Sequence, residues 1–155
     1  MLDVGDTAPL FQLPSDGGER VALKALRGRR VVLYFYPKDD TEGCTLEAKE
    51  FNALRDDFER AGAEVLGISP DSPASHDKFK RKHELGLRLV SDEQKEVAEA
   101  YGVWVEKSMY GRKFMGVERA TFLISPKGKI ERIWRKVRAK GHAEDVLSAL
   151  QGRKE

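Results

Sequence analysis

The residues best suited to chemistry in this chain are its one cysteine, Cys44, and the threonine three positions before it, Thr41. Residues 31–36 are β-branched or aromatic side chains with one leucine, and Pro37 follows them, which predicts a buried strand that stops shortly before Cys44. In α/β folds, ligands bind beyond the carboxyl ends of strands. The first turn of a helix also has unpaired N–H groups and the positive end of the helix dipole, and both stabilise a thiolate. The pattern therefore predicts a nucleophilic cysteine.

Thr41 and Cys44 have the spacing of a capping box, with a sulfur in place of the usual carboxylate. If Thr41 is the N-cap, Cys44 is the third helical residue, and the two side chains meet over the same few backbone donors. Counting back four residues from Ala48, on the apolar stripe of this helix, reaches Cys44, so we expect the sulfur to face a pocket. The alternative is a buried and inert cysteine. Asp39 and Asp40 favour that alternative, because nearby carboxylates disfavour a thiolate.

The length of 155 residues and the 40% hydrophobic content predict a single domain over residues 1–155 with a full core. The formal net charge is only +2, and the longest apolar run is six residues, too short to span a membrane. Residues 1–6 lack the basic and apolar regions of a signal peptide. We therefore expect a cytoplasmic protein, and a single cysteine excludes an internal disulfide.

Strand and helix patterns alternate along the chain. The expected strands are residues 31–36, 64–69, 87–90, 120–125 and 129–137. The expected helices are residues 41–61, a segment after Pro73, residues 93–101 and residues 142–150. Residues 103–117 show no clear period, and we expect a loop there. The alternation predicts an α/β fold in which a central mixed sheet has helices on both faces.

The spacing Pro-x-x-x-Thr-x-x-Cys, formed by Pro37, Thr41 and Cys44, resembles the active-site signature of the peroxiredoxins. Several longer strings resemble the bacterioferritin-comigratory, or Q-type, subfamily in the same order along the chain: residues 35–41, 43–45, 67–72, 100–104, 109–112, 118–124 and 140–144. This resemblance covers nearly the whole chain. It implies a thioredoxin-like fold of the peroxiredoxin variant. It also implies an antioxidant enzyme that reduces hydrogen peroxide and organic hydroperoxides through a peroxidatic cysteine.

The resemblance also implies a role for each residue of the site. Cys44 would attack the peroxide oxygen, and the Thr41 hydroxyl and the Cys44 backbone N–H would orient the substrate. Arg119 would place a guanidinium beside the sulfur, with Glu47 steadying it and Pro37 as a further supporting residue. Helical spacing agrees, because Glu47 lies three residues after Cys44 and only about 60° around the helix from it. Without the resemblance, Arg119 and Glu47 would be interpreted as surface charges.

The chain departs from the subfamily pattern at Lys49, where many members have a resolving cysteine. Other members place that cysteine in the next helix, where this chain has none. We interpret Lys49 as the natural residue, because a laboratory knockout would more often leave serine or alanine. An external thiol, such as thioredoxin or glutaredoxin with glutathione, must then reduce the sulfenic acid of Cys44. The sequence leaves open which donor acts, which peroxide is preferred and the oligomeric state, for which we expect a monomer or weak homodimer.

Two other functional classes compete with a peroxidase. One is a thiol–disulfide oxidoreductase or peroxide sensor that relays oxidation to a partner protein, and the absence of a Cys-x-x-Cys motif counts against it. The other is a non-catalytic interaction module that uses an inactive fold. The intact Thr41, Cys44 and Arg119 count against that class.

Metal, cofactor and nucleic-acid functions have weaker support in the sequence. His76 and His83 are seven residues apart on a predicted helix, but no zinc or calcium pattern accompanies them, and we expect solvated side chains. The basic runs at residues 78–82 and 135–138 occur in a chain of nearly neutral charge with no nucleic-acid motif. We therefore expect no metal, no cofactor, no nucleic acid and no membrane partner.

Overall fold

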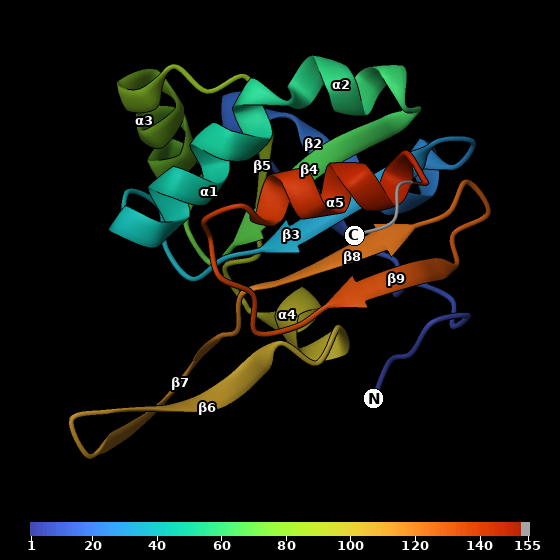
Figure 1. The fold of residues 1–155 in the computed structure, drawn as a ribbon. Coiled ribbons are helices and arrows are strands. Elements are labelled where there is room, and N and C mark those ends of the chain that lie inside the picture. Colours follow the sequence, from blue (N-terminus) through green and yellow to red (C-terminus); the bar gives the residue numbers. More distant parts are fainter. Residues whose placement is uncertain (153–155) are drawn as a thin grey trace.

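The central sheet has the strand order β5–β4–β3–β8–β9 in the computed structural model, which describes residues 1–152 (Figure 1). Its strands are β3 (Arg30–Phe35), β4 (Ala63–Ser69), β5 (Arg88–Ser91), β8 (Ala120–Ile124) and β9 (Ile130–Trp134). The strand β3 pairs in parallel with β4, which pairs in parallel with β5, whereas β8 is antiparallel to both β3 and β9. The sheet is therefore mixed, as predicted, and β3 lies at its centre.

Side chains of β3 alternate between two hydrophobic cores, because successive residues of a strand point to opposite faces. One core contains Leu33 and Phe35, and the other contains Val32 and Tyr34. The helices α1 (Glu42–Ala53), α2 (Arg55–Arg60), α3 (Pro73–His83) and α5 (His142–Leu150) cover the Tyr34 face. On the Phe35 face lie α4 (Glu96–Ala100), β1 (Gln12–Pro14), β2 (Arg20–Ala22) and the short 3₁₀ helix η2 (Leu23–Leu26). A second 3₁₀ helix, η1 (Asp16–Gly18), joins β1 to β2.

The single helix expected over residues 41–61 is two helices. Leu54 breaks it with φ −98° and ψ 6°, and its N–H is shared between the carbonyls of Glu50 and Phe51. The break redirects α2 so that Phe58 packs beside Phe51, with ring centroids 5.8 Å apart. Helix α4 is also shorter than expected. Its first turn is fixed by the buried Asp92, whose carboxylate accepts hydrogen bonds from two backbone N–H groups of α4.

The loop expected over residues 103–117 is wrong, because the segment forms a β-hairpin. Its strands β6 (Trp104–Met109) and β7 (Arg112–Val117) pair antiparallel. Tyr110 and Gly111 form the turn with φ of 52° and 78°, the positive values that a two-residue hairpin turn needs. The hairpin extends away from the sheet (Figure 1), and its outer side chains Met109, Tyr110, Phe114 and Met115 are exposed. Little of the hairpin is buried, so its polar and apolar residues need not alternate. Alternation is a main signal from which strands are predicted in a sequence.

Within residues 1–152, the structure contains no helix with the length and apolar character needed to cross a membrane.

Candidate active site

Cys44 lies in the first turn of α1, just beyond the end of the central strand β3. Thr41 is the N-cap by its extended backbone, with φ −91° and ψ 158°, so Cys44 is the third helical residue as predicted. The predicted capping bond is absent: the Thr41 hydroxyl donates to the Lys38 carbonyl oxygen at 2.8 Å and accepts from no N–H of the helix. Asp40, with φ 60°, turns the chain back between these two residues. The lone pairs of the Thr41 oxygen therefore stay available to another donor.

A single guanidinium joins the sulfur to a buried carboxylate. Nη2 of Arg119 lies 3.4 Å from Sγ of Cys44, and Nη1 of Arg119 donates to Oε1 of Glu47 at 2.6 Å. Cys44 is 2% exposed and Glu47 is fully buried. Gly43 leaves the room for this contact, because a Cβ at that position would lie 3.1 Å from Nη2 of Arg119. The structure thus brings together three residues that the sequence predicted for the site.

Burial dominates the electrostatics of Glu47. Loss of solvent raises the pKa of Glu47 to about 7, although the neighbouring Arg119 lowers it. Its second oxygen, Oε2, has no hydrogen-bond partner within residues 1–152. For Arg119, burial opposes the charged form, but Glu47 and Cys44 outweigh it, so the pKa of Arg119 is raised. One fixed positive charge therefore faces two groups that can each become an anion.

Lys107 is a residue of this region that sequence reasoning missed. It projects from β6, and burial and the charge of Arg119 lower the pKa of Lys107, whereas Cys44 raises it. Its side chain passes over Gly116 in the facing strand, where a Cβ would lie 3.2 Å from Cδ of Lys107. Because residues 103–117 were expected to form a loop, nothing in the sequence pattern placed Lys107 near the sulfur. The available signal was Gly116, the glycine over which the Lys107 side chain passes.

A neutral histidine supports the sheet beneath the site. His142, at the start of α5, is buried, and its Nε2 lies 2.7 Å from the Thr121 hydroxyl oxygen on β8. The His142 ring packs edge-on against Phe51 and Trp134. Burial lowers the pKa of His142 to about 4, with a smaller contribution from Arg119 in the same direction and an opposing one from Asp145. The β8 strand that begins beside Arg119 is thereby fixed to α5.

The solvated side chain expected at His76 is wrong. His76 is fully buried, and it forms a cluster with Asp39 and Asp71 in which one ligand-type atom from each lies within 4.8 Å of the others. His83 bonds to Asp40 Oδ1 at 2.8 Å. The clustered atoms could hold a cation by type and spacing. Each cluster member, however, already forms hydrogen bonds within the chain.

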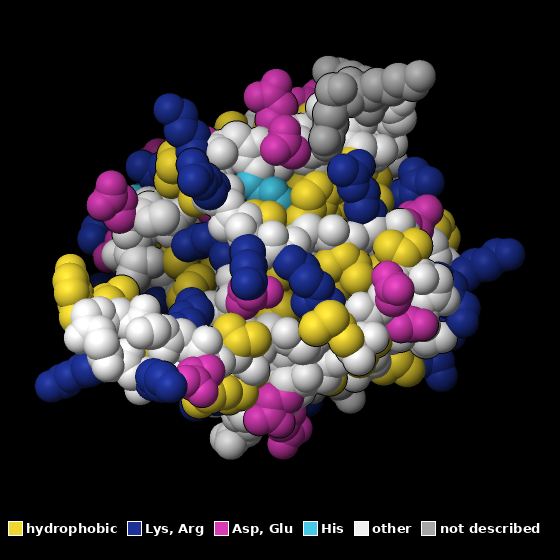
Figure 2. Space-filling model, turned by 60° about the horizontal axis from the view of Figure 1, so that its bottom comes forward, with side chains coloured by type: hydrophobic (Ala, Val, Ile, Leu, Met, Phe, Trp, Pro, Cys, Tyr) yellow, Lys and Arg dark blue, Asp and Glu magenta, His cyan; other side chains and the backbone are white. Residues whose placement is uncertain are grey.

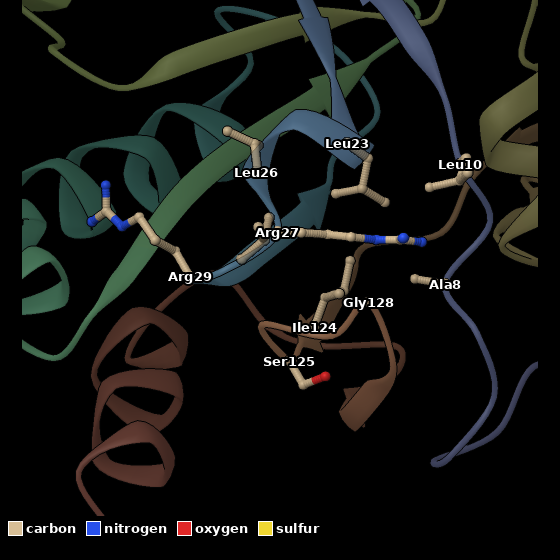
Figure 3. Close-up of a pocket in the computed structure, with 10 residues that line it drawn as sticks. Ala8, Leu10, Leu23, Leu26, Arg27, Arg29, Ile124, Ser125 and Gly128 are labelled. Carbon is tan, nitrogen blue, oxygen red and sulfur yellow. The ribbon is translucent and has the colours of Figure 1, made fainter.

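The hollow shown in Figure 3 lies at the opposite end of β3 and is not part of this site. The Arg27 side chain extends across it toward Ala8 and Gly128 (Figure 3). The hollow has a volume of about 10 Å³, which is at the lower limit for one water molecule. On the face shown in Figure 2, Lys and Arg side chains are interspersed with Asp and Glu rather than gathered into one patch.

Comparisons with known proteins give one consistent result. A sequence model described as the AhpC/TSA family matches residues 4–133. A putative peroxiredoxin bcp of Coxiella burnetii is 48% identical over 149 residues, which cover 96% of this chain and 99% of that protein. Peroxiredoxin Bcp of Xanthomonas campestris is 48% identical over 146 residues, covering 93% of this chain and 91% of its own length.

Solved structures agree with the sequence relatives. The bacterioferritin comigratory protein of Xanthomonas campestris, studied for its alkyl peroxide reduction activity, superposes with a TM-score of 0.87 at 46% identity. That match covers 92% of this chain and 90% of the other. A cysteine-to-serine mutant of Xylella fastidiosa PrxQ gives a TM-score of 0.93 at 41% identity, over 98% of this chain and 97% of the other.

Proposed function

The chain belongs to the AhpC/TSA family as a one-cysteine peroxiredoxin similar to the Bcp and Q-type proteins, and we propose that Cys44 is the residue at which it reduces peroxides. It is a thiol-dependent peroxidase with a thioredoxin-like fold. The alternative of a thiol–disulfide oxidoreductase or sensor is not favoured. The observation that carries the assignment of Cys44 is its contact with Arg119, which itself bonds to Glu47.

In the proposed reaction, the Cys44 thiolate attacks one oxygen of a hydroperoxide. An S–O bond forms and the O–O bond breaks, so the sulfur is oxidised to a sulfenic acid. The leaving alkoxide or hydroxide takes a proton from solvent to give an alcohol or water. Arg119 stabilises the charge that moves from sulfur to the leaving oxygen. The backbone N–H of Cys44 has no carbonyl partner within the helix, because the third helical residue precedes the first α-helical bond. That N–H and the Thr41 hydroxyl would orient the peroxide.

Thiolate formation by itself supplies too little rate. Lowering a thiol pKa from about 8.5 to about 6 raises the thiolate fraction at neutral pH about thirtyfold, and part of that gain is lost because nucleophilicity falls with pKa. One preorganised donor aimed at developing charge contributes about 10²–10³ in rate. The donors around the sulfur, and Arg119 above all, therefore account for more of the activity than the thiolate fraction does.

We propose that an external thiol completes the cycle. Cys44 is the one cysteine of the chain, and the exposed Lys49 stands where many relatives of this subfamily have a second thiol. Thioredoxin, or glutaredoxin with glutathione, would attack the sulfenic sulfur, release water and leave a mixed disulfide that a second thiol reduces. We further propose hydrogen peroxide and organic hydroperoxides as substrates. A free thiol that must stay reduced supports a cytoplasmic location.

The protein is proposed to work as one domain over residues 1–155, as a monomer or weak homodimer. In support, the sheet order places β8 beside β3 and β9 beside β8, so the second half of the chain completes the sheet begun by the first. The site itself also needs both halves, because Cys44 and Glu47 come from α1 and Arg119 comes from just before β8.

The test is peroxide consumption measured side by side with three reductants: thioredoxin, glutaredoxin with glutathione, and dithiothreitol. We expect turnover with at least one of them and none in Cys44→Ser. Lys49→Ala serves as the matched control, since it changes the same helix on an exposed face. Peroxide consumption by Cys44→Ser at the wild-type rate would refute the assignment of Cys44.

A further inference from the structure

A buried polar cluster lies behind the loop that leads into α1, outside the reacting atoms. His76 on α3 is fully buried and Asp39 in the loop is 7% exposed. Burying an ionisable side chain is unfavourable unless it is paired and hydrogen-bonded. His76 Nδ1 lies 2.7 Å from Asp39 Oδ2, and His76 Nε2 lies 3.1 Å from the carbonyl oxygen of Val90. Both ring nitrogens are therefore used.

Both side chains of the pair have further hydrogen-bond partners. A backbone carbonyl only accepts, so Nε2 of His76 carries a proton. The Asp39 carboxylate already accepts from the Tyr36 hydroxyl at 2.6 Å and from the Ser75 hydroxyl at 2.8 Å. Together with Nδ1 of His76, these hydroxyls place three polar groups around the Asp39 side chain. The two side chains form a buried hydrogen-bonded pair whose other polar atoms also have partners.

The backbone of the same loop is fixed as well. The Asp39 N–H donates to Oδ2 of Asp71 at 2.8 Å, and that oxygen also accepts from the Ser69 hydroxyl at 2.6 Å. Asp39 is therefore fixed to the end of β4, to α3 and, through His76 and Val90, to β5. It stands two residues before the N-cap Thr41, so any movement of Asp39 is transmitted to the first turn of α1.

We propose that Asp39 and His76 form a positioning pair that holds the active-site loop, residues 37–41, so that Cys44 stays aligned with Arg119. This inference rests on the proposed function of Cys44. The sulfur and the guanidinium come from different elements, and a contact of 3.4 Å between them depends on how the first turn of α1 is seated. Misplacement by about 1 Å at a reacting centre can cost about 10² in rate. The pair thus acts on the reaction through the loop, without touching peroxide.

The experiment compares two reactions of the same sulfur in Asp39→Asn. Asparagine has nearly the wild-type volume, but an amide NH₂ replaces one carboxylate oxygen, so the side chain can accept fewer of these hydrogen bonds. Oxidation by hydrogen peroxide requires alignment with Arg119, whereas alkylation by iodoacetamide requires only an accessible thiolate. We expect the rate of oxidation to fall about tenfold or more, with alkylation unchanged or faster. Hydrogen exchange should speed up over residues 37–45 and stay unchanged over residues 120–124.

His83→Gln is the matched control. His83 lies on the same helix and bonds to Asp40, the next residue of the loop, but from a more exposed position. Exposed pairs contribute little, so both rates should stay within about twofold of the wild type. Ser75→Ala provides a milder variant that removes one donor to Asp39 and should lower the oxidation rate by less than Asp39→Asn does.

An unchanged ratio of oxidation to alkylation in folded Asp39→Asn would overturn the proposal. So would hydrogen exchange that rises equally across the chain. Failure of the proposed function is distinguishable, because it would show in Cys44→Ser, which leaves this pair intact.

Discussion

Arg119 places two nitrogens of one planar group on two different partners, the sulfur of Cys44 and the carboxylate of Glu47. A lysine could supply the charge but not this fork, because an ammonium is a point donor on a flexible stem. The carboxylate fixes the plane of the guanidinium, and the free edge then faces the reacting atoms.

Arg119→Ala should lower kcat/KM for hydrogen peroxide by about 10²-fold or more, the cost of losing one preorganised donor. Arg119→Lys should recover only a small part of that loss. Circular dichroism and denaturant midpoints check that both variants fold. Near-normal turnover in either variant would show that the guanidinium does not stabilise the breaking O–O bond.

Glu47 and His142 make stability depend on pH in opposite directions. The pKa of Glu47 is raised by burial from 4.5 to about 7, so its contribution is complete below pH 4.5 and is lost as the pH rises through about 7. The pKa of His142 is lowered from 6.5 to about 4, again mainly by burial. Its contribution is complete above pH 6.5 and is lost as the pH falls toward 4.

Glu47→Gln and His142→Gln should therefore separate two opposing slopes. Both slopes are about 1.4 kcal/mol per pH unit and have opposite signs, so they nearly cancel in the wild type between about pH 5 and about pH 6. Free energies of unfolding from urea titrations at several pH values check this. Relative to the wild type, Glu47→Gln should gain stability as the pH rises from about 5 to about 8. His142→Gln should gain stability relative to the wild type as the pH falls from about 7 to about 4. Parallel curves for all three proteins would contradict the assigned protonation states.

At the scale of the element, the first turn of α1 differs from a capping box in one respect that matters for function. The Thr41 hydroxyl donates its proton to the Lys38 carbonyl and leaves its lone pairs unused by the helix. Thr41 therefore has the backbone conformation of an N-cap, while its hydroxyl oxygen can accept a hydrogen bond from a donor outside the helix.

Thr41→Val removes this hydroxyl and should lower peroxide turnover by about tenfold to 10²-fold. The loss of stability should stay below about 1 kcal/mol, because the bond to Lys38 is exposed to solvent. Thr41→Ser keeps the hydroxyl and should retain most of the activity. Steady-state kinetics of the three proteins measure this, and equal activity of Thr41→Val and wild type would remove Thr41 from the mechanism.

At the scale of the whole molecule, the single cysteine limits the oxidised states that are available. Position 49 is about 140° around the helix from Cys44, and Lys49 is exposed whereas Cys44 is buried. A thiol at that position could reach the sulfur only after the start of α1 unwound, and this chain has none. Oxidation has no intramolecular disulfide as its endpoint.

One equivalent of hydrogen peroxide should therefore yield a sulfenic acid, a mixed disulfide with an added small thiol, or a Cys44-to-Cys44 disulfide between two chains. Excess peroxide should drive the sulfenic acid on to sulfinic acid. Intact mass spectrometry with and without a sulfenic-acid trapping reagent distinguishes these products. Protein that gains no oxygen, forms no adduct and forms no dimer after peroxide treatment would contradict a peroxidatic Cys44.

The sequence by itself determined the mixed α/β fold and the place of Cys44 at a helix start, because both follow from local patterns. Short runs rich in β-branched and aromatic residues predicted the strands of the central sheet, and a proline followed by Thr-x-x-Cys located the nucleophile. Resemblance to a known family then added Arg119 and Glu47, which lie far apart in the chain. Spacing on one helix could relate Glu47 to Cys44, but it could not relate either residue to Arg119.

Only the tertiary structure decided which polar groups are buried together. His76 and Asp39 belong to different elements, and the pattern of neither element marks its residue as buried, so their pairing follows from the packing of α3 against β5 and the loop. The hairpin β6–β7 was not predicted for the opposite reason. It is largely exposed, so its polar and apolar residues need not alternate. The periodicity of a segment indicates which of its residues pack against one core. The contacts of this site, in contrast, join residues from several elements. Those contacts form only when the sheet brings the elements together.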